Sequence, residues 1–329
     1  MVERYVVSMR PTGLGDRLIC LCAAWIFARD TGRALVADWR HSRYSEGRKG
    51  NLFPLCFLAP QRIGTVPVIC DDGFSESALP YPRHPAIWSD PAHWQFPRCY
   101  DRPDDELISD TEKAVELICS AQDVDAPTVV FDGCISDALV SWRDALTFFS
   151  ALRPIPEVER EVADFADSYL GAGPWIGLHI RHGNGGDIMG HAPYWQSFED
   201  AIARCTRAID AARQELGAQT SVFLSTDSID VQNAIQQSVE GVICRRKTFR
   251  DPGEGELHLG SKSWDGRDDA LVEMLLLARS GALIRYPPGS FFSFYAAVMK
   301  PSRLPHPETV FDLYRPADPT DGLSPALLL

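Results

Sequence analysis

The chain has 329 residues, 45% of them hydrophobic and 23% charged, which is the balance of a globular protein with about two domains. Its formal net charge of −13 argues against nucleic acid and anionic membranes as partners, because both bind basic surfaces. The sequence has nine cysteines but no CxxC pair, no secretory leader and no apolar run that could span a bilayer, so we expect a cytoplasmic protein without a transmembrane segment.

The first half begins as a strand, a glycine-containing loop and a helix. Eight prolines from Pro54 to Pro97 then interrupt any long element. A Pro154-Ile155-Pro156 step ends this half and marks the expected domain junction. The expected elements are strands over residues 4–9, 34–38 and 129–131 and a helix over residues 16–31.

The second half alternates strands and helices more regularly. Its clearest helix carries apolar residues from Phe198 to Leu216 at a 4-3-4-3-4 spacing and stops at Gly217. An earlier helix is expected to place Tyr169 on the same apolar face as Val158. The other expected elements are strands over residues 176–180, 222–224, 242–244 and 283–286, helices over residues 229–239, 270–279 and 291–299, and a proline-rich loop after Pro301.

Alternating strands and helices imply parallel sheets with helices on both faces. We therefore predict an α/β fold of two Rossmann-like domains facing a cleft. The N-terminal domain is expected to span residues 1–155 and the C-terminal domain residues 156–329.

Polar residues follow every strand of the second half, at one edge of the expected sheet. They are Arg181, His182 and Asn184 after the first strand, Asp227 after the second, Arg245–Lys247 after the third and Ser290 after the fourth. Cations and helix N-termini at such an edge can bind a nucleotide diphosphate, and the planar fork of Arg181 donates two hydrogen bonds at once. A simpler role stays open for Asp227 and Ser290, because each could be the N-cap of the next helix.

The glycine loop of the first half permits a second interpretation. Gly13, Gly15 and the later Asp38 resemble a dinucleotide fingerprint, but Leu18 stands where its third glycine belongs. An NAD-dependent oxidoreductase is therefore the alternative function. The same glycines could instead let the backbone approach another ligand. HExxH, P-loop lysine and GxSxG motifs are missing from the sequence.

Four segments carry a resemblance to a known family: RYVVSMRPTGLGD from residue 4, GLHIRHGNGGDIMGHAPYW from 177, VFLSTDS from 222 and ALIRYPP from 282. Together they resemble the rhizobial nodulation fucosyltransferases, relatives of the eukaryotic core α-1,6-fucosyltransferases. The resemblance implies a GT-B-like fold, with the acceptor on the N-terminal domain and GDP-fucose on the C-terminal domain. It also implies inverting transfer of L-fucose from the donor substrate GDP-β-L-fucose to the 6-hydroxyl of the reducing-end N-acetylglucosamine of chitooligosaccharides or Nod factors. By the same resemblance we expect neither a metal nor a cofactor. A sugar-binding protein of this fold without turnover is a further alternative.

The resemblance also implies roles for single residues. Arg181 would hold the β-phosphate, His182 stands where the core enzymes carry a second arginine, and Asp227 matches a guanosine-side aspartate. Glu273 replaces an aspartate of the third motif. Gly190 replaces an acidic residue of some relatives, so the general base is open between Asp187 and His191. The expected donor-binding set is Arg181, His182, Asn184, Asp227, Glu273, Ser290, Gly13 and Gly15, and the expected catalytic set is Arg181, Asp187 and His191.

Overall fold

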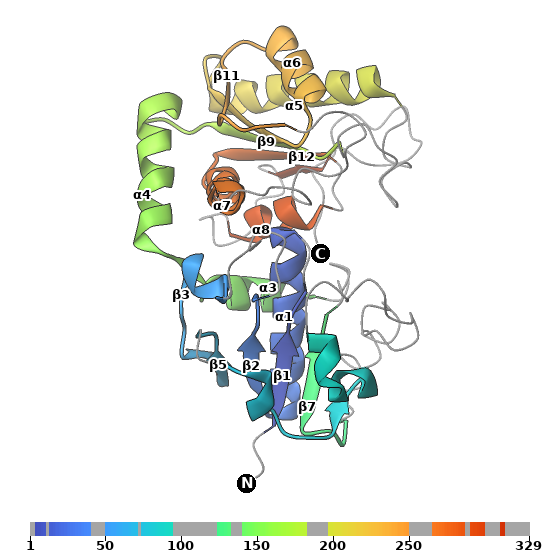
Figure 1. Cartoon of the computed structure of the whole chain (residues 1–329). Helices are drawn as coiled ribbons and strands as arrows, with labels where there is room; N and C mark the ends of the chain where they lie inside the picture. The colour runs from blue at the N-terminus through green and yellow to red at the C-terminus, as the bar shows by residue number, and fades with distance from the viewer. Residues whose placement is uncertain are drawn as a thin grey trace. The chain divides into compact units, whose positions relative to one another are not determined.

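The computed structural model describes residues 4–10, 13–40, 50–71, 74–94, 124–132, 140–182, 197–249, 265–286, 290–299 and 310–312. These residues fall into two compact units, one ending at Ile155 and the other beginning at Pro156. Each unit is built around a mainly parallel sheet and is described by itself (Figure 1). None of the helices in the described ranges is long and apolar enough to cross a membrane.

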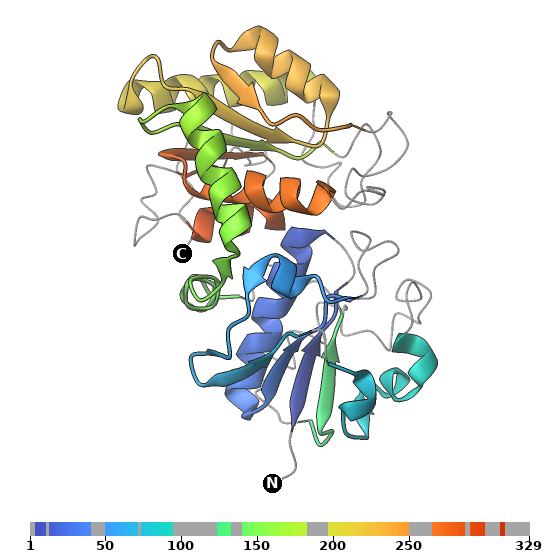
Figure 2. The ribbon, with the colours of Figure 1, turned by 60° about the vertical axis from the view of Figure 1, so that its left-hand side comes forward.

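The described residues of the first unit form a six-stranded sheet in the order β4-β5-β2-β1-β7-β6, parallel except between β4 and β5. Helix α1 (Leu14–Thr31) packs along this sheet (Figure 2) and is buried almost all round, as its nearly continuous apolar sequence requires. The strands are β1 (Tyr5–Ser8), β2 (Ala34–Ala37), β4 (Arg62–Ile63), β5 (Val66–Ile69), β6 (Arg83–His84) and β7 (Thr128–Phe131). Short segments complete the unit: 3-10 turns at Phe53–Leu55, Glu76–Ala78, Ala86–Ser89 and Pro91–Trp94, helix α3 (Trp142–Phe149), and the antiparallel pair β3 (Phe57–Leu58) and β8 (Arg153–Pro154).

The described residues of the second unit form a five-stranded, all-parallel sheet in the order β11-β10-β9-β12-β13. Helices α5 (Phe198–Leu216) and α6 (Ile229–Ser238) cover one face, where they pack on Ile176, Leu178 and Ile180 of β9. Helix α7 (Asp265–Ala278) lies on the opposite face with α4 (Pro156–Phe165) and α8 (Phe291–Val298) against it (Figure 1). The strands are β9 (Ile176–Ile180), β10 (Val222–Thr226), β11 (Val242–Cys244), β12 (Ala282–Tyr286) and β13 (Val310–Asp312).

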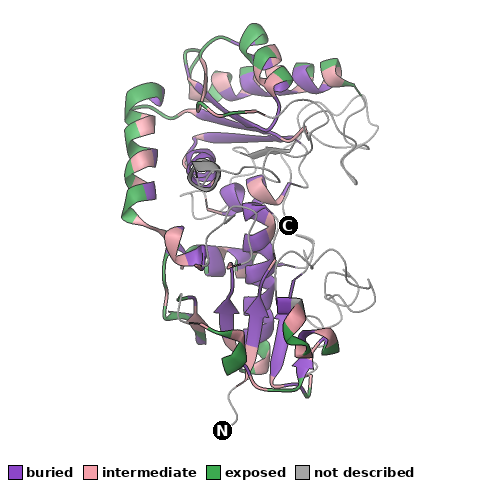
Figure 3. Cartoon of the chain, in the orientation of Figure 1, coloured by how far each residue is buried: buried purple, intermediate pink, exposed green. Residues whose placement is uncertain are grey.

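Alternating β and α elements therefore give the predicted α/β class in both units. The strands at the centre of each sheet are buried almost completely (Figure 3): β1, β2 and β7 in the first unit and β9, β10 and β12 in the second. Helix α5 has the predicted bounds, because its apolar spacing matches the helical repeat and Gly217 caps it. Two expectations were wrong. Residues Val310–Asp312 form an edge strand on β12 rather than a loop. Tyr169 is 63% exposed, because a π-helical turn over Ala166–Leu170 rotates it away from the apolar face of α4.

Candidate functional site

The carboxyl ends of β9, β10 and β12 bring a row of polar side chains together. Ser225 of β10 and Arg285 of β12 are the register partners of His179 on β9, so all three lie on one face of the sheet. This is the face that α7 and α8 cover. Ser225 donates a hydrogen bond to Glu273 of α7 (2.6 Å). Arg285 donates one to Ser293 of α8 (3.1 Å).

Arg181 comes directly after β9, two residues beyond His179. Its backbone N–H donates to the carbonyl of Tyr286 (2.8 Å), which extends the β9–β12 pairing past the end of the strand. Its guanidinium Nη1 lies 2.8 Å from Oδ2 of Asp227, and the two side chains are only 16% and 7% exposed. The structure thus places Arg181, the predicted cation, at the sheet edge, where it is partly buried and forms an ion pair with Asp227.

His182 shares the same carboxylate through its backbone. Its N–H donates to Oδ1 of Asp227 (2.8 Å), and its half-buried ring meets Phe198 edge-on with the centroids 5.7 Å apart. Burial lowers the pKa of this imidazole, and the charges of Asp227 and Asp230 oppose the shift. His182 is therefore neutral near pH 7.

Asp227 is not the N-cap of α6. Ser228 has that role, because its side chain accepts the N–H of Val231 (3.4 Å). The alternative of a capping role for Asp227 is therefore wrong. Its carboxylate instead joins the ends of two neighbouring strands through Arg181 and His182.

Glu273, the expected donor-binding residue of α7, lies in a buried ion pair. Lys247 Nζ is 2.8 and 2.9 Å from its two carboxylate oxygens, and Ser225 donates to one of them. The side chains of Lys247 and Glu273 are 9% and 6% exposed. Lys247 was absent from the predicted site set, although it ends the cationic run Arg245–Lys247 after β11.

His179 lies at the centre of this polar layer. Its ring stacks on Phe292 with centroids 5.1 Å apart, and its buried Nδ1 has no hydrogen-bond partner in the described structure. Burial, reinforced by the nearby cations, lowers the pKa of His179 to about 3, while Asp227 opposes the shift. Arg285 was missed by the sequence analysis, because it interrupts an apolar strand and nothing local marks its partner Ser293.

Ser290, Gly13 and Gly15 all lie at helix starts. Ser290 precedes α8 without a capping hydrogen bond from its side chain, and its carbonyl accepts the N–H of Phe294 (3.0 Å). Gly13 precedes α1, and its carbonyl accepts the N–H of Arg17 (3.0 Å). Gly15 is buried in the first turn of α1.

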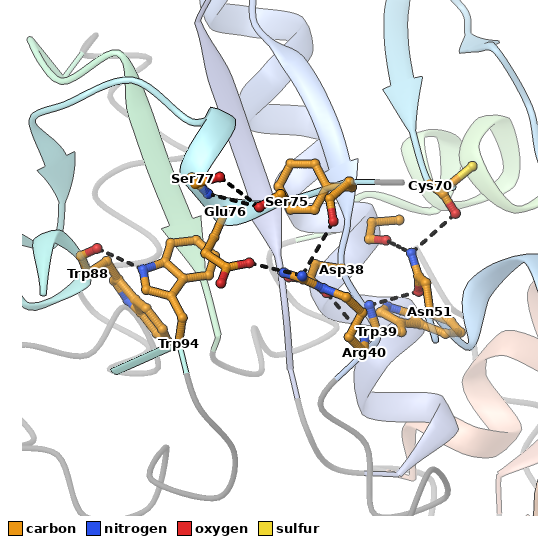
Figure 4. A network of polar contacts seen from close by, with 12 residues as sticks. Asp38, Trp39, Arg40, Asn51, Cys70, Ser75, Glu76, Ser77, Trp88 and Trp94 are labelled. Carbon is orange, nitrogen blue, oxygen red and sulfur yellow. Dashed lines mark hydrogen bonds and ion pairs between the residues drawn. The ribbon is translucent and has the colours of Figure 1, made fainter. Parts of the chain in front are cut away.

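Asp38, which the dinucleotide interpretation needs for a ribose, is already bound. Its fully buried carboxylate pairs with Arg40 at 2.7 Å, and Arg40 reaches Glu76 at 2.9 Å (Figure 4). The neighbouring Asn51 accepts the N–H of Trp39 and donates to the carbonyl of Cys70, so the segment after β2 is fixed by hydrogen bonds. This arrangement disfavours an open hydroxyl-binding carboxylate at Asp38.

Comparison with known proteins identifies the family. The family model for nodulation protein Z (NodZ) matches residues 2–318. This chain belongs to the nodulation protein Z family. Nodulation protein Z of Bradyrhizobium diazoefficiens is 39% identical over 304 residues, which cover 91% of this chain and 80% of that protein. A NodZ α-1,6-fucosyltransferase co-crystallised with GDP superposes with a TM-score of 0.70 at 32% identity, covering 89% of this chain and 91% of that one. A NodZ α-1,6-fucosyltransferase soaked with GDP-fucose gives a TM-score of 0.69 at 30% identity, covering 91% of this chain and 93% of that one.

Membership in the nodulation protein Z family agrees with the resemblance carried by the four segments and with the predicted GT-B-like fold, in which each unit is built on a mainly parallel sheet. Three residues of the expected site, Asn184, Asp187 and His191, lie outside the described residues. Within the described ranges, no group of three or more histidine, cysteine, aspartate or glutamate side chains is placed to hold a metal ion.

Proposed function

We propose that this chain, which belongs to a fucosyltransferase family, transfers L-fucose from GDP-β-L-fucose to the 6-hydroxyl of the reducing-end N-acetylglucosamine of a chitooligosaccharide or Nod factor. The reaction inverts the anomeric centre and uses no metal. Related NodZ enzymes crystallised with GDP and soaked with GDP-fucose support the donor. The observation that carries the proposal is Arg181, fixed by Asp227 at the carboxyl edge of a buried parallel sheet.

Arg181 supplies the electrostatic part of the mechanism. As the bond between C1 of fucose and the β-phosphate oxygen breaks, negative charge grows on GDP. A guanidinium can donate two parallel hydrogen bonds to that phosphate, and its charge acts strongly where little water is present. Arg181 then performs the leaving-group stabilisation that other transferases obtain from a divalent metal. The neutral His182, Asn184, Glu273 and Ser290, with the backbone at Gly13 and Gly15, are the further proposed donor contacts.

The acceptor hydroxyl attacks C1 from the face opposite to GDP, and its proton passes to a base. Asp187 and His191 both follow the strand that carries Arg181 and are the two candidates. General base catalysis of this kind contributes roughly 10²–10⁴-fold to the rate. The N-terminal unit is the proposed acceptor side.

The deciding assay incubates the protein with GDP-fucose and chitopentaose and locates fucose on the product by mass spectrometry. In this assay Arg181→Ala is expected to lower kcat/KM roughly 30- to 5000-fold, because removing one partner of a desolvated charge pair costs about 2–5 kcal/mol. The matched control is Arg204→Ala, which removes a partly exposed arginine of α5 paired with Asp200 and should leave turnover unchanged.

Four outcomes would contradict the proposal. The first is full activity of the Arg181 variant. The second is activity that is lost in EDTA and restored by Mn²⁺. The third is a titration in which NAD binds and GDP does not, which would favour the oxidoreductase. Binding of GDP-fucose without its consumption would leave a sugar-binding protein of the same fold.

A further inference from the structure

We propose that Arg285 is a positioning residue for the donor, which acts through Ser293 to hold Ser290 in place for the diphosphate. The inference rests on the proposed function, because Ser290 is there taken to be a donor contact. It gives a role to a buried arginine that the proposed mechanism does not use.

Arg285 is a buried cation whose hydrogen bonding leads to α8. It is 1% exposed on β12, and its Nε–H donates to Oγ of Ser293 at 3.1 Å. Removing a guanidinium from water is costly, so a buried arginine depends on its hydrogen bonds to offset the lost hydration. The bond to Ser293 is one of these, and it ties the end of β12 to the first turn of α8.

The hydroxyl of Ser293 passes this contact on to Ser290. It donates to the carbonyl of Ser290 at 3.2 Å, and the same carbonyl accepts the N–H of Phe294 at 3.0 Å. Because a hydroxyl has one hydrogen and a guanidinium only donates, the two bonds at Ser293 run in one direction, from Arg285 to Ser293 to Ser290. The backbone of Ser290 is thereby fixed by a side chain of the neighbouring strand.

Ser290 itself has a hydroxyl that its helix does not use. It is the N-cap of α8 and 8% exposed, yet its side chain accepts no N–H of that helix in the described structure. The N-cap serines of α3, α5 and α6 each accept one: Ser141, Ser197 and Ser228. The Ser290 hydroxyl is therefore available to donate to a phosphate oxygen.

Strand β12 also holds the other proposed contact to the diphosphate. The carbonyl of Tyr286 accepts the backbone N–H of Arg181 at 2.8 Å, and Arg285 is the residue immediately before it. Two consecutive residues of one strand therefore fix Arg181 and Ser290, the first through its backbone and the second through Ser293.

The first turn of α8 has a second attachment that does not involve Arg285. Phe292 stacks on His179 of β9, with the ring centroids 5.1 Å apart. This contact keeps the turn on the sheet when the Ser293 hydroxyl is removed. Loss of that hydroxyl should consequently change how Ser290 is oriented, while α8 stays in place.

The test is a double-mutant cycle on GDP binding, measured by calorimetry. Ser290→Ala should raise the Kd of GDP about tenfold or more, because it removes a hydrogen bond to a charged group. Ser293→Ala should raise the Kd about three- to tenfold, which corresponds to one neutral hydrogen bond. In the Ser290→Ala background, Ser293→Ala should have less than about a twofold further effect.

Kinetics separate positioning from loss of folded protein. With GDP-fucose and chitopentaose as substrates, Ser293→Ala should raise the KM of the donor by a factor similar to that for GDP. The KM of chitopentaose and kcat should stay within about twofold of wild type. Partial unfolding would instead lower kcat and the calorimetric stoichiometry, and leave the Kd and both KM values unchanged.

Arg285→Lys distinguishes position from charge. Lysine keeps the positive charge but places a methylene, Cε, where Nε of the arginine donates to Ser293. This variant should raise the Kd of GDP as Ser293→Ala does, so it also tests the inference if Ser293→Ala does not fold. The matched control is Ser238→Ala, which removes an exposed serine of α6 that donates to the carbonyl of Ala234 (2.8 Å) and should change none of these constants.

The inference and the proposed function fail in different ways. Wild-type affinity for GDP in Ser293→Ala or Arg285→Lys overturns the positioning role, and so does an effect of Ser293→Ala that multiplies fully with that of Ser290→Ala. The proposed function stands in each of these cases, because wild type still binds GDP and transfers fucose. If wild type does neither, the proposed function fails and the inference fails with it.

Discussion

Glu273 and Lys247 form an ion pair that is almost removed from water, with side-chain exposures of 6% and 9%. Ser225 adds a hydrogen bond to the same carboxylate. Desolvating such charges costs several kcal/mol each, which their attraction offsets only while both partners are present. The pair therefore contributes little net stability, but it makes the second unit sensitive to losing either charge.

Glu273→Gln is expected to lower the free energy of unfolding by about 3–5 kcal/mol, because it leaves the ammonium of Lys247 buried without its counter-charge. Urea denaturation measures this loss. The control is Glu159→Gln on α4, which breaks the more exposed ion pair with Arg279 and should cost at most about 1 kcal/mol. Combining Glu273→Gln with Lys247→Met should recover part of the loss. A loss as large in Glu159→Gln as in Glu273→Gln would contradict this account.

For single residues, the pattern of the sequence predicted a site residue where that residue stands at the end of a strand. Arg181 was predicted because it ends an apolar strand, and a strand end is visible locally. Arg285 was missed, and Lys247 was expected only as part of the cationic run after β11 and not in the site set. The partners of these two residues, Ser293 and Glu273, reach them only after folding. The contact of Asp227 with Arg181 spans 46 positions of sequence (227 minus 181) and has no local signature either.

Among the elements, the contact between β9 and the end of α7 depends on Gly177. A Cβ built at this glycine lies 2.8 Å from Ser280 Oγ, 3.0 Å from Ser280 Cβ and 3.2 Å from Leu277 Cδ2. Ser280 is buried and donates its hydroxyl to the carbonyl of Leu277, so it has little freedom to move away. The missing side chain thus sets how closely α7 approaches the strand that leads to Arg181.

Gly177→Ala is expected to lower the free energy of unfolding by about 1–3 kcal/mol, because overpacking forces side chains or backbone to shift. Chemical denaturation measures the change. Gly173→Ala is the matched control just before the same strand. A Cβ there has no neighbour within 4 Å, so its effect should stay within about 0.5 kcal/mol. Equal effects of the two substitutions would show that the close approach at Gly177 is tolerated.

Helices and strands whose apolar residues recur at a regular spacing were predictable from the sequence. Short strands that form only by pairing with a longer strand were not. Helix α5 was predicted to the residue from its apolar spacing and Gly217. Strands β4 and β6, each of two residues, and the edge strand β13 were not expected. Their sequences are proline-rich or too short to show an alternation, and pairing with a longer strand makes them part of a sheet.

For the molecule as a whole, the buried His179 makes the free energy of unfolding depend on pH. Its pKa is lowered to about 3 in the folded chain by burial, against an ordinary value of 6.5. The folded state therefore binds this proton less readily than the unfolded state does. Its contribution to stability is present above pH 6.5 and is lost as the pH falls toward 3.

The free energy of unfolding should therefore fall between pH 6.5 and pH 3, with up to about 1.4 kcal/mol per pH unit due to His179. His179→Gln should reduce this slope by that amount, as followed by urea denaturation at a series of pH values. Above pH 7 the slopes of variant and wild type should coincide, which is the internal control. Parallel curves between pH 6.5 and pH 3 would exclude His179 as a source of acid sensitivity.

The backbone hydrogen bond from Arg181 to Tyr286 has a consequence for how fast the site can rearrange. Strand β9 is paired on both sides, with β10 and with β12, and this bond carries that pairing one residue further. The amide of Arg181 should then exchange its hydrogen as slowly as the amides of the central sheet, because both are released by the same opening. Because the backbone of Arg181 is released only when the central sheet opens, it is already ordered before the donor binds. Donor binding therefore has no entropic cost of ordering the Arg181 backbone. Differences in donor affinity among variants that keep this bond should consequently appear in dissociation rather than association rates.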